Sequence, residues 1–315
     1  MYHVRFLSLE PTTKCNYNCV FCASRHFQAA HFSNPVDLAF PDFTKIVEKL
    51  PYLESVHLQG YGEPFLNVDI YKMIKFLKEK GIVVTTTTNG SLLNESNIEK
   101  LLQTGIDHVG VSLESPYEKE FSRIRRGGNL RQLISGIEQL THRIKEKGLQ
   151  KPAVGFCTTV MKSTMKDIEK IFTLYGELEM DGGILTQPLR DLPKFAEYYD
   201  ESIKNECLTY IERIALIKKT IKCSRKILLN KNVDIMSQVQ AIREYKECSS
   251  FKNLLYVNAL GYATLCSDIY DYGKYSLGSL LKDDLDHIMN NRQQKIFSYE
   301  NGRFPEECIE CISSR

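Results

Sequence analysis

The sequence predicts an α/β fold in which helices cover a parallel sheet, followed by a small C-terminal segment made of a hairpin and a helix. Strand-like and helix-like patterns alternate six times over the first two-thirds of the chain, and after residue 248 short strands follow one another directly. Six such units fit either an open doubly wound sheet or an incomplete barrel. In both architectures functional side chains are expected at the C-terminal ends of the strands.

The six strands are expected where β-branched and apolar residues run together or alternate with polar ones. The third is β-branched throughout, as in a strand that is buried on both faces. The expected strands span residues 3–9, 55–58, 82–88, 109–113, 153–160 and 183–186.

Helices are expected between the strands, where apolar residues recur three and four positions apart. Gly81 and Gly105 follow two of these segments as stop signals. The expected helices centre on residues 43–50, 70–77, 98–102, 130–140 and 168–178.

The pattern changes beyond Pro188. Residues 200–228 predict one long helix, residues 254–257 and 262–265 predict a hairpin, and residues 285–289 predict a short closing helix. We therefore expect three parts: a core at 1–190, a helical linker at 191–247 and a C-terminal domain at 248–315.

Composition narrows the class of protein. The 315-residue chain has no apolar run near the roughly 20 residues that span a membrane, and it begins without a signal peptide. Ten cysteines without an export signal indicate a reducing compartment and metal binding, which predicts a cytoplasmic protein. A net charge of only +2 argues against nucleic acid as a partner.

Three cysteines lie within eight residues, directly after the first expected strand. Cys15, Cys19 and Cys22 have the spacing C-x3-C-x2-C. Three thiolates can hold three irons of a four-iron cluster and leave the fourth iron open to another ligand. A zinc knot is the alternative, but zinc requires a fourth ligand that no nearby His or Cys provides.

This spacing, with Phe21 before the third cysteine, resembles the signature of the radical S-adenosylmethionine (SAM) superfamily. The resemblance implies a (β/α)6 partial barrel, and a [4Fe–4S] cluster whose open iron binds SAM, with Phe21 beside the cofactor. It also implies reductive cleavage of SAM to a 5′-deoxyadenosyl radical that abstracts a substrate hydrogen atom. A reducing donor such as flavodoxin or ferredoxin is then an expected partner.

The second expected strand ends in Gly60-Tyr61-Gly62-Glu63-Pro64. Glycines let a backbone approach a ligand closely, and a carboxylate accepts hydrogen bonds from an ammonium group. The segment resembles the superfamily's G-G-E-P motif, with Tyr61 in place of a glycine. The resemblance places Gly60, Gly62, Glu63 and Pro64 at the amino group of SAM, whereas a simple turn before a helix is the alternative.

The third expected strand ends in Thr88-Asn89-Gly90. A buried strand followed by an Asn-Gly turn accounts for this sequence equally well. The segment also resembles the T-N-G found at this point in the superfamily, which places Thr88 and Asn89 close to SAM.

The fourth expected strand ends in Ser112-Leu113-Glu114-Ser115, and Arg125 follows before two glycines. These residues resemble the superfamily pattern S-[IL]-D-G…Y-x-x-I-R-G-G. The resemblance implies that Ser112 and Glu114 bind the ribose of SAM, although Glu114 is one carbon longer than the usual Asp. Arg125 is expected to grip the carboxylate of SAM, because guanidinium binds carboxylates in a bidentate manner. No adenine-binding motif is visible.

A second set of cysteines lies in the C-terminal domain: Cys248, Cys266, Cys308 and Cys311. Four thiolates suit one fully ligated [4Fe–4S] cluster, and they would also hold a structural zinc. The spacing resembles a SPASM domain in its truncated, single-cluster form, Twitch, as in the 2-deoxy-scyllo-inosamine dehydrogenase type. The resemblance implies an auxiliary cluster that transfers electrons or is purely structural.

Together these resemblances imply a radical SAM enzyme with two [4Fe–4S] clusters. Oxidation of a sugar, cyclitol or similar small molecule is the leading expectation, because the auxiliary cluster can accept an electron from a substrate radical. A redox-neutral epimerase of a sugar or a peptide residue is the alternative, with Cys223 in the linker as the expected hydrogen-atom donor. A third possibility is a non-enzymatic iron–sulfur carrier, against which the SAM-site motifs argue.

The substrate is not named by the sequence, which allows a small molecule or a peptide. The first strand begins within a few residues of Met1, so no leader-peptide recognition domain is expected before the core. This favours a small molecule. Cys157, in the fifth expected strand, is interpreted as an ordinary small buried residue.

Overall fold

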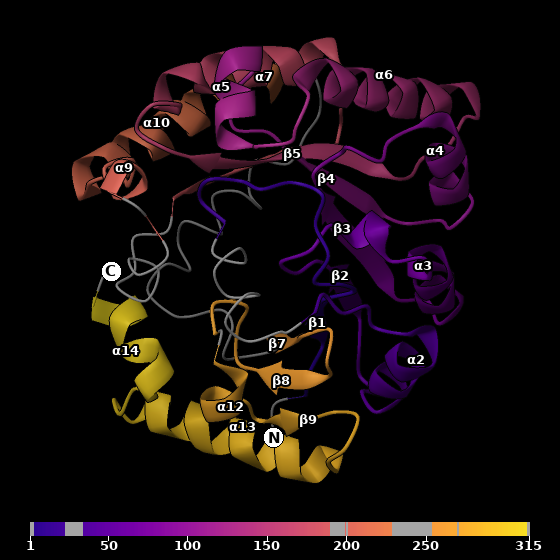
Figure 1. The fold of residues 1–315 in the computed structure, drawn as a ribbon, viewed down its shortest axis with the longest axis vertical. Coiled ribbons are helices and arrows are strands. Elements are labelled where there is room, and N and C mark those ends of the chain that lie inside the picture. The colour runs from indigo at the N-terminus through magenta and orange to yellow at the C-terminus, as the bar shows by residue number, and fades with distance from the viewer. Residues whose placement is uncertain are drawn as a thin grey trace.

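A curved sheet organises the chain in the computed structural model. The structure describes residues 3–22, 34–189, 199, 201–228, 254–269 and 271–313. Within them the strands follow the order β6-β5-β4-β3-β2-β1-β7-β8-β9. Figure 1 shows the strands curled into an incomplete ring with helices on the outside. The structure therefore confirms the partial barrel and excludes an open doubly wound sheet.

The six core strands are parallel, as the alternation of strands and helices predicted. The ends of these six strands differ from the predicted ones by at most three residues. The core strands are β1 (Phe6–Leu9), β2 (Ser55–Leu58), β3 (Val83–Thr88), β4 (His108–Ser112), β5 (Ala153–Val160) and β6 (Ile184–Pro188). The C-terminal part adds β7 (Leu254–Val257), β8 (Tyr262–Thr264) and β9 (Gly278–Ser279).

The helices of the core cover the outer face of the sheet (Figure 1). Each buries the apolar stripe by which it was predicted, as with Phe43, Ile46 and Val47 of α2. The helices and short 3-10 turns are α2 (Phe40–Glu48), η1 (Pro64–Leu66), α3 (Ile70–Glu79), α4 (Glu95–Leu102), α5 (Glu118–Ile124), α6 (Leu130–Glu146), η2 (Met165–Asp167), α7 (Ile168–Glu177), α9 (Glu201–Lys204), α10 (Tyr210–Leu228), α12 (Tyr272–Tyr275), α13 (Leu285–Glu300) and α14 (Glu306–Ser313).

The prediction of one unbroken helix over residues 200–228 is wrong. The segment is divided into α9 and α10, and the second helix begins with a capping box. The Thr209 backbone N–H donates to the Glu212 carboxylate at 2.7 Å, and the Glu212 N–H lies 3.4 Å from the Thr209 hydroxyl. These bonds satisfy N–H groups at a helix start, so they favour a new helix over a continued one.

The C-terminal hairpin extends the barrel sheet. β7 pairs in parallel with β1, and β8 and β9 continue the sheet in antiparallel pairing. The ion pairs Lys274–Glu306 and Lys295–Glu307 then join α14 to α12 and α13. The sequence predicted the hairpin, but it predicted neither its pairing with β1 nor α14.

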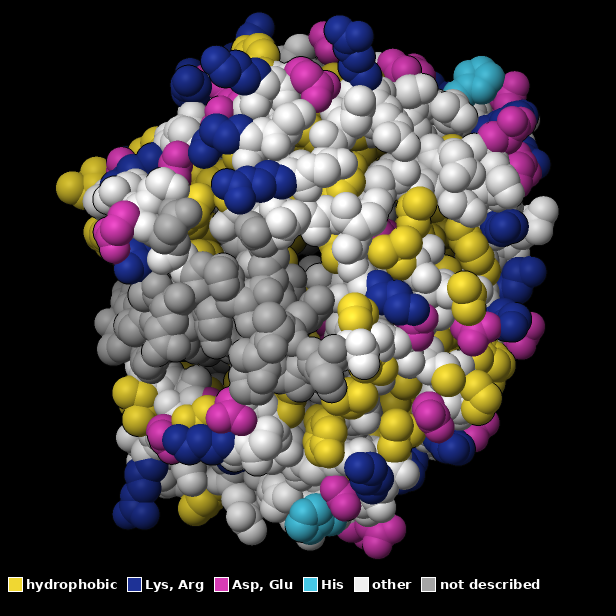
Figure 2. Space-filling model, in the orientation of Figure 1, with side chains coloured by type: hydrophobic (Ala, Val, Ile, Leu, Met, Phe, Trp, Pro, Cys, Tyr) yellow, Lys and Arg dark blue, Asp and Glu magenta, His cyan; other side chains and the backbone are white. Residues whose placement is uncertain are grey.

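Side chains of both charge signs lie mostly around the rim of the face in Figure 2, and hydrophobic or uncharged side chains occupy much of its described part between them. No helix among the described residues is both long and apolar enough to cross a membrane.

Candidate functional site

The loop after β1, with the three N-terminal cysteines, lies against the loops that follow β2, β3 and β4. The Asn18 N–H donates to the Arg126 carbonyl at 2.7 Å, and the Val20 N–H donates to the Ile124 carbonyl at 2.9 Å. The Asn89 side-chain amide donates to the Asn16 side chain at 2.9 Å. Backbone and side-chain hydrogen bonds therefore bring motifs that are more than 100 residues apart to one end of the barrel.

The three cysteines differ in exposure: Cys15 is exposed, Cys22 is half-buried and Cys19 is buried. Burial raises the pKa of the Cys19 thiol to about 12, and the nearby Arg125 opposes the shift. Among the described residues, no three His, Cys, Asp or Glu side chains converge closely enough to hold a metal ion. The fit of this loop to an iron–sulfur cluster therefore rests on its three thiol donors and on the cation beside them.

Gly60 and Gly62 allow two loops to pack closely. A Cβ on Gly62 would lie 2.2 Å from the Thr12 carbonyl oxygen, and one on Gly60 would lie 2.2 Å from Cγ of Glu10. Glycine was expected here because a ligand comes close. In the structure the close neighbours are the loop after β1 and the Glu10 side chain, so any larger residue would push the two loops apart.

Glu63 is buried and accepts three hydrogen bonds. Its carboxylate receives the Thr88 hydroxyl and the Asn89 N–H, each at 2.7 Å, and the Phe65 N–H at 3.2 Å. Burial raises the pKa of Glu63, and these donors and Arg125 partly oppose the shift. The structure thus joins the predicted residues Glu63, Thr88 and Asn89 in one network, while Pro64 begins the short η1 turn beside it.

Arg125 and Glu114 form a buried bidentate ion pair. Arg125 Nε lies 2.5 Å from Glu114 Oε2, and Nη2 lies 2.6 Å from Oε1. The third guanidinium nitrogen, Nη1, lies 3.7 Å from the Cys19 sulfur. Burial alone would lower the pKa of Arg125, but the Glu114 and Cys19 charges raise it above its ordinary value.

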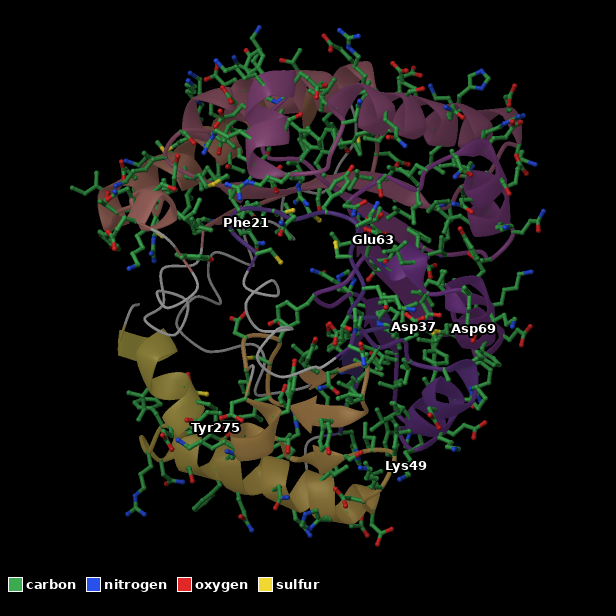
Figure 3. All side chains as sticks on the ribbon, in the orientation of Figure 1. Phe21, Asp37, Lys49, Glu63, Asp69 and Tyr275 are labelled. Carbon is green, nitrogen blue, oxygen red and sulfur yellow. The ribbon has the colours of Figure 1, made fainter. Side chains whose placement is uncertain are left out.

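The sequence predicted separate contacts with SAM for these two residues, whereas the structure pairs them with each other. The additional methylene of Glu114, compared with the usual Asp, extends its reach towards the guanidinium. Of the other predicted contacts, Ser112 is buried at the end of β4. Phe21 lies below Arg125, with its ring centre 5.6 Å from the guanidinium carbon. Figure 3 shows Phe21 and Glu63 on the inner side of the strand ring.

Polar side chains line the interior of the barrel. His57 Nδ1 lies 2.6 Å from the Thr85 hydroxyl, and its Nε2 contacts the Gln59 side chain. Burial lowers the pKa of His57, which favours its neutral form. The Thr87 hydroxyl lies 3.4 Å from His57 and 3.8 Å from the Cys157 sulfur. These groups provide hydrogen bonds without a net charge.

Cys157 belongs to this interior rather than to the apolar core. Along β5 it alternates with Val154, Phe156 and Val160, which pack towards the helices. A Cβ on Gly110 would lie 2.7 Å from the Cys157 sulfur, so the glycine makes room for the thiol. The alternation in residues 153–160 was the signal for this orientation, and the interpretation as a simple buried hydrophobe missed it.

Cys223 lies elsewhere. It is buried on α10 as part of the main hydrophobic core, and α10 packs against α7. Burial raises its pKa, and Glu169 of α7 adds to the shift. The sequence analysis named this thiol as the hydrogen-atom donor of an epimerase. Its place at the α7–α10 contact follows from the apolar stripe of α10 and argues against a role in hydrogen transfer.

Of the second cysteine set, Cys266 follows β8 and Cys308 lies on α14. Cys248 lies outside the described residues. Cys311 is on α14, but its side chain is also outside them. The convergence of all four on one cluster stays a prediction.

Sequence reasoning also missed Glu10, which follows β1 directly and is 1% exposed. Its carboxylate accepts the Tyr61 N–H at 2.7 Å and the Ala259 N–H at 3.2 Å. A charged residue at the C-terminal end of a parallel strand was the available signal.

Comparison with known protein families agrees with this geometry. Residues 9–175, more than half of the chain, match the model of the radical SAM superfamily. The chain belongs to the radical SAM superfamily. Residues 248–312 match the SPASM domain, described as an iron-sulfur cluster-binding domain. The two matches imply SAM and two [4Fe–4S] clusters as cofactors, in agreement with the cysteine sets.

Curated relatives cover only part of the chain. A tungsten-containing aldehyde ferredoxin oxidoreductase cofactor-modifying protein of Pyrococcus furiosus is 26% identical over 64% of this chain and 56% of its own. A probable GTP 3′,8-cyclase of Methanococcus maripaludis is 32% identical over 53% of this chain and 54% of its own. The chain thus spans about half the length of these relatives.

Solved structures share the fold over almost the whole chain. Streptococcus suis SuiB, solved with the precursor peptide SuiA, superposes with a TM-score of 0.71 and 14% identity, covering 98% of this chain and 70% of SuiB. BtrN, in complex with AdoMet and 2-DOIA, gives a TM-score of 0.51 and 13% identity, covering 95% and 88% of the two chains. At these identities the likeness concerns the fold.

Proposed function

We propose that this protein reductively cleaves SAM and removes a hydrogen atom from a C–H bond of its substrate. The observation that carries this proposal is the direct contact between the parts of the site. The Glu63 N–H donates to the Lys14 carbonyl at 2.7 Å, one residue before Cys15, and Arg125 Nη1 lies 3.7 Å from the Cys19 sulfur. When bound, the [4Fe–4S] cluster and SAM supply the electron and the 5′-deoxyadenosyl radical.

The residues have distinct proposed roles. Cys15, Cys19 and Cys22 hold the cluster, and Glu63 offers the free lone pairs of its carboxylate to the amino group of SAM. Arg125, held in place by Glu114, directs Nη1 towards Cys19 and the carboxylate of SAM. A fixed guanidinium so close to a thiolate also offsets the negative charge of the cluster ligands.

A second set of contacts surrounds these residues. Ser112 is the candidate partner of the ribose, and Phe21, Thr88 and Asn89 line the remaining sides. In the C-terminal domain we propose that Cys248, Cys266, Cys308 and Cys311 bind the auxiliary cluster. A reducing protein of the flavodoxin or ferredoxin type is the proposed electron donor.

For the outcome of the reaction we propose oxidation of a small, hydroxyl-rich molecule such as a sugar or cyclitol. The neutral hydrogen-bonding groups inside the barrel, His57, Thr85 and Thr87, suit hydroxyl groups. The auxiliary cluster provides a destination for the second electron. A peptide substrate is the alternative, since SuiB, of similar fold, was solved with a precursor peptide.

A redox-neutral reaction has one observation in its favour. The Cys157 thiol lies inside the barrel, 3.8 Å from the Thr87 hydroxyl, and burial raises its pKa, so that it keeps its hydrogen atom. A thiol in that position could return a hydrogen atom to a substrate radical. Cys157 therefore replaces Cys223 as the proposed donor for an epimerase.

The proposed function is tested by anaerobic reconstitution with iron and sulfide, followed by addition of SAM and dithionite. We expect about eight irons per chain, four for each cubane cluster, and formation of 5′-deoxyadenosine and methionine. A reconstituted protein with both clusters that forms no 5′-deoxyadenosine would contradict the proposal and favour an iron–sulfur carrier.

A further inference from the structure

Glu10 joins two parts of the molecule that lie about 200 residues apart in the sequence. It follows β1, and each of the two oxygens of its buried carboxylate accepts a hydrogen bond from one of these parts. Oε1 accepts the Tyr61 N–H at 2.7 Å, from the loop after β2. Oε2 accepts the Ala259 N–H at 3.2 Å, from the turn between β7 and β8. One side chain thus holds both the G-x-G-E-P loop and the auxiliary-domain hairpin.

Tyr61 makes a second connection between the same two parts. Its hydroxyl donates to the Ser267 carbonyl, one residue after Cys266. Its ring belongs to an apolar cluster with Phe21 of the cysteine loop and Tyr256 of β7. The residue that replaces a glycine of the usual motif therefore reaches the segment of a proposed auxiliary-cluster ligand.

The loop passes from Tyr61 directly into the candidate SAM site. Gly62 packs on the backbone of Thr12 and Lys14, and the Glu63 N–H donates to the Lys14 carbonyl. The Gly60 backbone packs directly against the Glu10 side chain, so the loop after β2 cannot shift at Tyr61 without moving Glu10 as well. A displacement of the hairpin turn would therefore be transmitted to Glu63 through Tyr61 and Gly62, which are both tightly packed.

We propose that Glu10 is a positioning residue that couples the occupancy of the SAM site to the auxiliary-cluster domain, by holding the Tyr61 and Ala259 backbone N–H groups together. Tyr61 reinforces the coupling through Ser267. This proposal rests on the proposed function, because it takes Glu63 as a ligand of SAM.

The coupling depends on pH, because each of the two N–H donors meets a different carboxylate oxygen of Glu10. Burial raises the pKa of Glu10 to about 7, although the Tyr61 and Ala259 N–H groups oppose the shift. Protonation places a hydrogen on one of these oxygens, which makes that oxygen a poorer acceptor and weakens its contact with the N–H group. Among the residues that the structure describes, the titratable side chain that interacts with Glu10 is the Tyr272 phenol of α12; burial raises the pKa of this phenol, and Glu10 adds to the shift. Tyr272 thus stays neutral in the range where Glu10 titrates.

The experiment compares wild type and Glu10→Gln as anaerobically reconstituted holoenzymes. The Gln amide keeps the shape of Glu but has only one acceptor oxygen. Wild type should bind SAM about three- to tenfold more tightly than Glu10→Gln at pH 8, as expected for one hydrogen bond. The advantage should disappear at pH 6. Taking the ratio of the two dissociation constants removes the titration of SAM itself.

Amide hydrogen exchange gives an independent measurement of the coupling. In Glu10→Gln the Tyr61 and Ala259 amides should both lose protection, and added SAM should protect both amides in wild type. The matched control is Glu54→Gln, which breaks an exposed ion pair with Arg5 just before β2. It should leave the SAM affinity and both amides unchanged.

Tyr61→Phe provides a second variant in case Glu10→Gln does not fold. It removes the bond to Ser267 and keeps the N–H bond to Glu10. It should weaken SAM binding about threefold and retain the pH dependence, with a midpoint near 7. An affinity ratio for Glu10→Gln that is constant from pH 6 to pH 8, or SAM protection that reaches Tyr61 and not Ala259, would overturn the proposal. Failure of wild type to form 5′-deoxyadenosine would instead count against the proposed function, because the exchange of the two amides is measured without catalysis.

Discussion

Glu114 and Arg125 form a bidentate ion pair in which both side chains are nine-tenths buried or more. The third guanidinium nitrogen of Arg125, Nη1, contacts the Cys19 sulfur, so the pair joins the loop after β4 to the cysteine loop. Burying two charges is costly, and an uncompensated partner costs more than the intact pair. The pair therefore fixes the orientation of Arg125 at the site.

Glu114→Gln should lower the free energy of unfolding by about 3–5 kcal/mol, because Arg125 is left buried without its counter-charge. Thermal unfolding of the anaerobic protein measures the loss. Glu120→Gln, in the partly exposed pair with Arg123, is the control and should cost under about 1 kcal/mol. Equal losses in the two variants would show that the buried pair has no special role.

The triple variant Cys15→Ala, Cys19→Ala and Cys22→Ala should bind about half the iron of wild type, roughly four atoms per chain. It should form no 5′-deoxyadenosine, because the iron that binds SAM is missing. Iron analysis and chromatography of the products measure the two effects. Normal SAM cleavage by this variant would refute the assignment of the cysteine loop.

The pair variant Cys266→Ala and Cys308→Ala should lose the other half of the iron and keep the electron paramagnetic resonance signal of the SAM cluster. Cys223→Ala, a buried cysteine outside both sets, is the control and should retain about eight irons. A stoichiometric zinc ion at the C-terminal cysteines would contradict an auxiliary iron–sulfur cluster.

Turnover in heavy water separates oxidation from epimerisation. An oxidation yields a product two electrons more oxidised, with no solvent deuterium at the reacting carbon. An epimerase places deuterium there through an exchangeable thiol, and Cys157→Ala should then abolish formation of the epimer. Deuterated product with Cys157→Ala fully active would exclude Cys157 as the donor.

Glu10 should make stability depend on pH. Its pKa is raised from 4.5 in the unfolded chain to about 7 in the folded one, so the folded state prefers the proton and loses stability as pH rises through this interval. At about 1.4 kcal/mol per pH unit the loss is on the order of 3 kcal/mol. Above pH 7 the melting temperature of wild type, relative to that of Glu10→Gln, should therefore be lower than at pH 4.5. A difference that does not vary with pH would contradict a buried, titrating Glu10.

The site could be predicted from sequence where its parts are local. One loop carries Cys15, Cys19 and Cys22, and Glu63 and Asn89 each follow a strand. The cysteine spacing and the strand ends were therefore enough to predict that these residues lie together. The partner of Arg125 could not be predicted in this way. Whether its guanidinium meets Glu114 or a ligand depends on side-chain reach across the space between β4 and the loop after α5.

The sequence by itself determined the β/α alternation, the two cysteine sets and the strand ends at which the motifs lie, because these depend on periodicity and on residue types that are close along the chain. Only the tertiary structure decided that β7 pairs with β1, that Cys157 faces the barrel interior while Cys223 packs against α7, and that Glu10 lies between the G-x-G-E-P loop and the hairpin. Strand pairing over about 250 residues and the burial of single carboxylates depend on the packing of the whole chain, and no local pattern encodes them.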